Sequence, residues 1–258
     1  MKKIISLILS AILCLTAVAF VSCDKKSDDS VIKVAASSTP HAEILEQCKS
    51  AMAEKGFTLE IEVMSDYVIP NTSVEDGEFD ANYFQHQPYL DDFVKEHPEV
   101  KLVNAGGIHI EPMGIYSKSL KDLKDVKAGA TVAIPNDPTN GGRALSLLAK
   151  AGLIQLKDGV GVAATVNDVV KNEKNLKFQE LEAAQVPRAL EDVDLAVINS
   201  NFAMQIQLNP VKDTLFIEDA SSPYVNIVSV RTGDEGRPEI QALLKALKSE
   251  KVKKFIIH

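Results

Sequence analysis

Tryptophan is absent from the 258-residue sequence, aromatic residues make up only 5%, and there are three cysteines. Basic and acidic residues are interspersed and the net charge is −8, so no basic stripe is available to bind a phosphate backbone, and nucleic-acid binding is disfavoured. The GxGxxG, P-loop, HExxH and GxSxG motifs are missing as well. We therefore expect no enzyme, no cofactor and no metal site. The alternative is a catalytic or metal site assembled from residues that are distant in the sequence.

The amino-terminal segment has the order of an export signal. Two lysines precede an apolar run at 4–21, and a polar stretch follows it. The Phe-Val-Ser-Cys run at 20–23 resembles a bacterial lipobox, in which the signal is removed before a cysteine that carries lipid. We expect a lipoprotein signal peptide at 1–22, lipid on Cys23 and a tether at 23–30. The alternative is a retained transmembrane helix, since the run is near the lower limit of a spanning length.

The cysteine positions agree with a lipoprotein. Cys14 lies inside the expected signal and Cys23 would carry lipid, so only Cys48 remains in the mature domain. A single thiol cannot close an internal disulfide, and stability must come from a packed core. Cys48 falls on the apolar face of a helical pattern, which favours a buried, unreactive thiol over a nucleophile.

The rest of the chain alternates β-branched runs with helical periodicity, which predicts an α/β fold with largely parallel sheets. Its hydrophobic content of 45% suffices for a packed core. Strands are predicted at 31–36, 59–64, 101–104, 131–135, 176–180, 195–199 and 215–218. Helices are predicted at 41–55, 88–96, 139–151, 166–171, 186–191, 202–207 and 238–248.

Two long extended segments, 108–117 and 223–231, interrupt this alternation and are candidate hinges. If both connect two lobes, the first lobe comprises 31–110 plus 222–258 and the second comprises 111–221. A ligand cleft is then expected between the lobes. A single mixed sheet containing two long strands is the alternative.

A candidate anion site lies at 134–143, between a predicted strand and a predicted helix. Pro138 suits a first helical turn, and Asn136 or Asp137 could cap it. The free backbone N–H groups of such a helix start attract anions, and Arg143 could hold a carboxylate with two hydrogen bonds. The alternative is an ordinary capped helix with a solvated arginine.

A second candidate feature is a group of aromatic residues in a chain that has few. Tyr67, Phe84 and Tyr89, with the imidazole of His86, suggest an apolar pocket wall with a polar handle, or else simple core packing. The five histidines show no short metal-ligand spacing, so a zinc site would require long-range assembly. Asn199 and Asn226, each beside or within an apolar run, are candidate ligand-facing amides or strand-end turn formers.

Several of these segments together resemble one known family, the NlpA-type, MetQ-like methionine-binding lipoproteins. The resemblance covers nearly the whole chain after the signal, in order. It is carried by DYVIPN at 66–71, ANYFQH at 81–86, PNDPTN at 135–140, GLI at 152–154, LAVIN at 195–199 and SPYVN at 222–226.

The resemblance implies a two-lobed periplasmic-binding-protein type II fold that binds L- or D-methionine between its lobes. It further implies delivery of methionine to an ABC permease made of membrane subunits with a cytoplasmic ATPase, by a monomer anchored through lipid to the cell membrane. The family's ligand positions fall on Tyr67, Phe84, His86, Tyr89, Arg143, Asn199 and Asn226. The competing hypotheses are a binding protein for another small amino acid or a dipeptide, and a surface adhesin or antigen lipoprotein.

Overall fold

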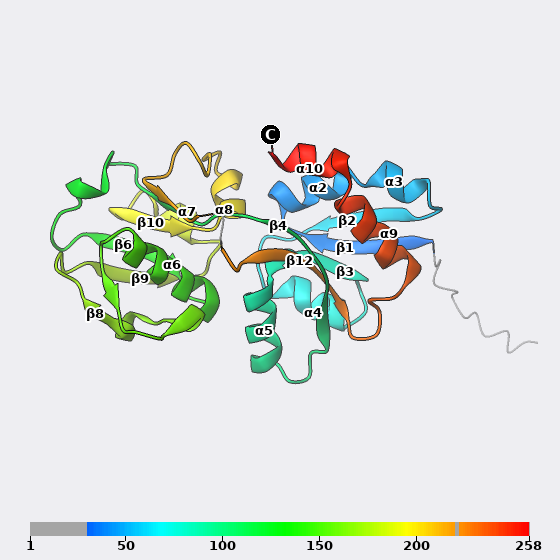
Figure 1. The fold of residues 1–258 in the computed structure, drawn as a ribbon, viewed down its shortest axis with the longest axis horizontal. Helices are drawn as coiled ribbons and strands as arrows, with labels where there is room; N and C mark the ends of the chain where they lie inside the picture. The colour runs from blue at the N-terminus through cyan, green and yellow to red at the C-terminus, as the bar shows by residue number, and fades with distance from the viewer. Residues whose placement is uncertain (1–29, 220–221, 258) are drawn as a thin grey trace, which may run out of the picture.

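The computed structural model describes residues 30–219 and 222–257. The expected signal peptide and Cys23 therefore lie outside the described residues. Two five-stranded sheets form the frame, and Figure 1 shows them at opposite ends of the long axis. The single mixed sheet considered above is not formed.

The first sheet has the strand order β2 (Thr58–Val63), β1 (Val31–Ala36), β3 (Ala81–His86), β12 (Val225–Arg231) and β4 (Leu102–Ile110). Strand β1 is parallel to β2 and β3, whereas β12 is antiparallel to β3 and β4. Helical segments cover both faces. They are the turn η1 (Ser38–Ala42), α2 (Glu43–Glu46), α3 (Lys49–Ala53), α9 (Pro238–Leu247) and α10 (Glu250–Ile257) on one face, and α4 (Ile69–Glu75) and α5 (Gln87–Glu96) on the other.

The second sheet has the order β11 (Phe216–Ile217), β5 (Gly114–Tyr116), β10 (Leu195–Ile198), β6 (Thr131–Pro135) and β9 (Lys177–Leu181). Its three strands β10, β6 and β9 run parallel, and β5 is antiparallel to β10 and β11. Helix α6 (Pro138–Lys150) packs on one face, and α7 (Val186–Ala189) and α8 (Ser200–Gln205) pack on the other.

Strand β6 illustrates why these sheets are buried on both faces. Successive side chains of a strand point to opposite faces. Val132 and Ile134 accordingly enter the core beneath α6, whereas Ala133 between them enters the core beneath α7 and α8. A largely apolar run rich in β-branched residues is the sequence pattern of such a strand, and the run at 131–135 has it.

Two connections join the sheets. Residues 111–113 lead from β4 of the first sheet to β5 of the second, and the chain returns between β11 and β12 (Figure 1). The two connections leave the first sheet side by side, because Ile110 at the end of β4 pairs with Val225 at the start of β12. Of the two extended segments predicted from the sequence, 108–117 runs from the end of β4 through this connection into β5, whereas 223–231 is mostly strand β12 of the first sheet and only its first residues belong to the connection.

The prediction of a helix over 166–171 is wrong. The turn η4 covers only Val166–Asp168, and β8 (Val169–Lys171) pairs with β7 (Gln155–Leu156). Asp168 closes the turn by accepting hydrogen bonds from the backbone N–H and the hydroxyl of Thr165, both at 2.8 Å. The β-branched residues that follow then continue as a strand.

Both sheets are mixed rather than largely parallel, because β12 and β5 run against their neighbours. The remaining short turns are η2 (Leu123–Asp125) and η3 (Gly161–Ala163). Cys48 is buried as predicted, and burial raises the pKa of its thiol to about 12. Within residues 30–219 and 222–257, no helix has the length and apolar character needed to span a membrane.

Candidate functional site

One cavity lies between the two sheets, and all seven residues predicted from the sequence line it. The space between its atoms is about 330 Å³. The lining residues are Tyr67, Phe84, Gln85, His86, Tyr89, Glu111, Asn140, Arg143, Asn199, Ser200, Asn201 and Asn226.

Helix α6 begins at the cavity, and its first turn is capped by Asp137 rather than Asn136. The Asp137 carboxylate accepts hydrogen bonds from the backbone N–H of Asn140 at 2.9 Å and from the Asn140 side-chain amide at 3.0 and 3.1 Å. The anion that this helix start attracts is therefore a carboxylate of the chain itself. Burial raises the pKa of Asp137, although these donors oppose the shift.

The Asn140 amide links the two sides of the cavity. Because its nitrogen donates to Asp137, its oxygen points away and accepts from His86 Nε2 at 3.0 Å and from Asn199 Nδ2 at 2.8 Å. His86 ends β3 of the first sheet, whereas Asn199 follows β10 of the second. One amide oxygen thus holds residues from both sheets.

His86 is neutral, and its hydrogen-bond partners identify the tautomer. It caps α5, since its Nδ1 accepts from the backbone N–H of Tyr89 at 3.1 Å. The proton must then be on Nε2, which donates to Asn140. Burial and the nearby positive charge of Arg143 lower the pKa of His86 to about 3.

Arg143 is buried, and its charge is already paired. Its Nε lies 3.1 Å from both carboxylate oxygens of Glu218, and its Nη2 also contacts Glu218. Nη2 donates in addition to the backbone oxygen of Glu111 at 2.7 Å, and the Tyr224 ring centroid lies 4.2 Å from the guanidinium carbon. The two-point hold expected for a ligand carboxylate is thus made with Glu218. Only Nη1 has no hydrogen-bond partner among the described residues.

The three predicted rings, Tyr67, Phe84 and Tyr89, form the apolar wall, and Phe202, which the sequence analysis missed, packs against Tyr67. Tyr67 lies 5.5 Å from Phe84, 5.7 Å from Tyr89 and 4.9 Å from Phe202, measured between ring centroids. The Tyr67 hydroxyl donates to Asn201 Oδ1 at 2.7 Å. Phe202 and Asn201 come from α8 of the second sheet, so Tyr67 closes the cavity from the opposite side.

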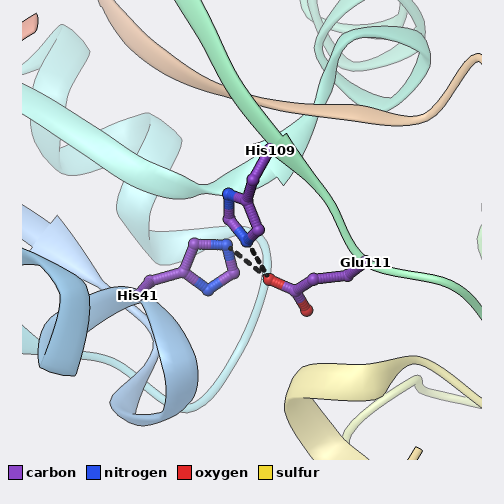
Figure 2. Close-up of side chains that lie close together, drawn as sticks. All are labelled: His41, His109 and Glu111. Carbon is purple, nitrogen blue, oxygen red and sulfur yellow. Dashed lines mark hydrogen bonds and ion pairs between the residues drawn. The ribbon is translucent and has the colours of Figure 1, made fainter. Parts of the chain in front are cut away.

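Glu111, which the sequence analysis missed, is the buried anion of the cavity. Figure 2 shows the Nε2 atoms of His41 and His109 converging on one of its oxygens, at 3.1 and 2.8 Å, while the other oxygen points away from both rings. Burial would raise the pKa of Glu111, but the two histidines and Arg143 together lower it below its usual value. Glu111 is therefore ionised at neutral pH.

A sequence signal for this cluster was available. His109 and Glu111 are two positions apart in an extended segment, which places their side chains on the same side. The third member, His41, lies in η1, a long distance away in sequence, and no local pattern indicates that pairing.

Two buried polar atoms of the cavity have no hydrogen-bond partner among the described residues. They are Oδ1 of Asn199, an acceptor, and Nδ2 of Asn201, a donor. Leaving such a group unpaired costs about 1–3 kcal/mol. The cavity thus offers an acceptor and a donor to a ligand, besides the negative charge of Glu111.

Comparisons with known proteins identify the family and the fold of the chain. The NlpA lipoprotein family model matches residues 32–258. The methionine-binding lipoprotein MetQ of Bacillus subtilis is 45% identical, over 99% of this chain and 95% of its own. Among solved structures, a nutrient-binding protein from Burkholderia cenocepacia bound to methionine has a TM-score of 0.84 at 46% identity, over 87% of this chain and 95% of its own. A periplasmic substrate-binding protein of an ABC transporter from Coxiella burnetii has a TM-score of 0.83 at 42% identity, over 86% and 94%.

Proposed function

Since the chain belongs to the NlpA lipoprotein family, we propose that it binds methionine in the cavity between its sheets and delivers it to an ABC transporter. It is a binding protein and not an enzyme. The observation that carries the assignment is that one cavity offers both an anionic acceptor, Glu111, and hydrogen-bond donors, Arg143 and Asn201, beside an aromatic wall. An α-amino acid presents a positive and a negative group on one carbon, and both must be matched when it is buried.

Glu111 is our candidate partner for the ligand's ammonium group. Its carboxylate is ionised, and the histidines use only one of its oxygens. The second oxygen and the unpaired Oδ1 of Asn199 can each accept a hydrogen bond from an ammonium group. A charge-assisted bond of this kind is about twice as strong as a neutral one.

The ligand's carboxylate is assigned mainly to donors of the second lobe, with one further donor from β12 of the first sheet. Arg143 Nη1 and the unpaired Nδ2 of Asn201 are available as donors. The positive charge of Arg143 also lies at the cavity, although it is paired with Glu218. Asn226 lines the same cavity, where its oxygen lies 3.2 Å from His41 Nε2. Its amide nitrogen is a further donor for the carboxylate.

The aromatic wall accounts for the side chain of methionine. A thioether gains about 0.3–1.5 kcal/mol from each sulfur–aromatic contact. Tyr67, Phe84 and Tyr89 offer ring faces and edges within one cavity, and neutral His86 adds no charge to it. This lining favours a polarizable apolar side chain over a charged one.

We assign 31–110 plus 222–258 to one lobe and 111–221 to the other. In this proposal the lobes separate to admit methionine, and the bound ligand then stabilises the closed arrangement. A single chain supplies every lining residue, so a monomer suffices. The proposal includes a lipid anchor at Cys23 on the cell membrane, and transfer of methionine to membrane subunits driven by a cytoplasmic ATPase.

Mass spectrometry of ligand released by denaturing the purified protein tests the assignment, with calorimetry on the emptied protein in EDTA. Methionine is the expected released ligand. Glu111→Gln should weaken its binding about tenfold or more, because a charge-assisted bond contributes about 1.5–3 kcal/mol. The exposed Glu99→Gln is the matched control and should bind as the parent does. Failure of methionine to bind at millimolar concentration would refute the assignment, and unchanged affinity of Glu111→Gln would remove Glu111 from the site.

A further inference from the structure

The cluster of His41, His109 and Glu111 has a composition that methionine binding alone does not require. Two imidazole nitrogens and one carboxylate oxygen lie within 4.8 Å of one another. They come from three segments, namely the turn η1, strand β4 and the connection to the second sheet (Figure 2). Two histidines and one glutamate, with a fourth position left for water or another ligand, form a known type of zinc site.

We propose that His41 Nε2, His109 Nε2 and a carboxylate oxygen of Glu111 form a binding site for a divalent transition-metal ion, for which Zn²⁺ is the best match. Imidazole ligands favour zinc and its neighbours over magnesium or calcium. The inference adds a site to the proposed function and does not depend on methionine being the ligand.

The spacing of the three atoms supports the proposal. Tetrahedral ligands about 2.0–2.1 Å from zinc lie roughly 3.3 Å from one another. The two nitrogens lie 3.1 and 2.8 Å from the Glu111 oxygen, within about half an ångström of that spacing, and all three atoms lie within 4.8 Å of one another, so shifts of the two imidazole rings would complete the arrangement. Asn226 Oδ1, at 3.2 Å from His41 Nε2, is a candidate for the fourth position.

The outer nitrogen of each ring has a partner suited to a metal site. The Ser37 hydroxyl lies 2.6 Å from His41 Nδ1, and the Tyr83 hydroxyl lies 2.7 Å from His109 Nδ1. A hydroxyl can either donate or accept. Without metal, each hydroxyl can donate to Nδ1 while the Nε2–H group of the ring donates to Glu111. With metal bound at Nε2, the ring carries its proton on Nδ1, and the hydroxyl accepts a hydrogen bond from it. Such outer hydrogen bonds orient metal-binding histidines in general.

Charge also permits a cation at this place. Glu111 supplies a negative charge, and the nearby positive charge of Arg143 is paired with Glu218. A metal on Glu111 would neutralise the carboxylate that the proposed function assigns to the ligand's ammonium group. Where both proposals hold, metal and methionine must oppose each other, and by linkage each weakens the other by the same factor.

Zinc binding to the methionine-free, full-length protein tests the site, measured by competition with a chromophoric chelator. One Zn²⁺ per chain is expected, with Co²⁺ giving the visible absorption of a tetrahedral nitrogen–oxygen site. His109→Gln and Glu111→Gln should each weaken zinc binding about 100-fold or more, since each removes one of three ligands. The matched control is His97→Gln, because His97 is exposed and outside the cluster.

The outcomes separate this proposal from the proposed function. Stoichiometric zinc binding that both cluster variants lose, and His97→Gln retains, supports the site. No saturable binding at micromolar zinc, or equal binding by cluster and control variants, overturns it. Thermal melting checks that each variant folds, and His41→Gln provides a second route if one does not. Methionine binding in EDTA is measured separately, so its failure would contradict the proposed function alone.

Discussion

Replacing His86 with asparagine should remove a defined part of the protein's pH dependence. His86 is 5% exposed, and burial with the Arg143 charge lowers its pKa to about 3, against 6.5 for an exposed histidine. Between these values the unfolded chain binds a proton that the folded chain does not. Stability from this group is therefore fully present above pH 6.5 and is lost as the pH falls towards 3.

The size of the loss follows from the two pKa values. A difference of about 3.5 units corresponds to nearly 5 kcal/mol over the whole interval. At pH 5 the calculated loss is about 2 kcal/mol, and it depends almost entirely on the unfolded pKa because the folded pKa is far lower. Asparagine retains an oxygen that can cap α5 but does not titrate.

Urea unfolding at pH 5.0 and 7.5, followed by far-ultraviolet circular dichroism in methionine-free protein, measures this loss. Circular dichroism suits a chain that lacks tryptophan. The difference in unfolding free energy between the two pH values should be about 2 kcal/mol smaller in His86→Asn than in the parent. His97→Asn, at an exposed position, should keep the parental difference. An equal pH dependence in His86→Asn and the parent would refute the buried, neutral histidine.

Three further predictions concern the anchor, the buried ion pair and the ligand. Cys23→Ala should leave the membrane fraction or remain unprocessed, as checked by fractionation and mass spectrometry of the amino terminus. Arg143→Ala should lower the unfolding free energy by about 3–5 kcal/mol because Glu218 stays buried without its charged partner, and Arg143→Ala/Glu218→Ala should recover part of it in urea melts. Methionine sulfoxide should bind about tenfold or more weakly than methionine in competition calorimetry. Its added oxygen costs about 1–3 kcal/mol without a donor, and His86 Nε2 already donates to Asn140.

The elements that the sequence predicted best are those with a local cause. Strands 31–36 and 131–135 are short runs rich in β-branched residues, and their bounds agree with the structure. Helix α6 begins at Pro138 behind the Asp137 cap, two signals that lie next to each other in the chain. Strand β3 was missed because polar residues interrupt it. Its Asn82 and Gln85 are buried and bonded to each other, at 2.8 Å, and to Asn71 of α4.

For the site, single residues could be predicted from the sequence, but the contacts between them could not. Residues at strand ends and helix starts could be identified singly, and the cavity brings together all seven that were named. Partnerships between distant residues could not be predicted. Arg143 suggested a carboxylate partner, but no local pattern indicates that Glu218, 75 positions away, is that partner. His41 and Glu111 are likewise joined only by the fold.

Contacts across the cavity set how easily the two sheets can separate. His86 to Asn140 and Tyr67 to Asn201 are hydrogen bonds between neutral groups from opposite sheets. Each contributes about 1 kcal/mol net, because water replaces the partner when the bond opens. Contacts of this strength make closure favourable by only a few kcal/mol. A ligand present at about 1,000 times its Kd adds about 4 kcal/mol to the closed arrangement, provided that it contacts both sides and binds that arrangement alone. Glu111, on the connection between the sheets, and Asn199 and Asn201, beyond it, give methionine those contacts in the proposed arrangement.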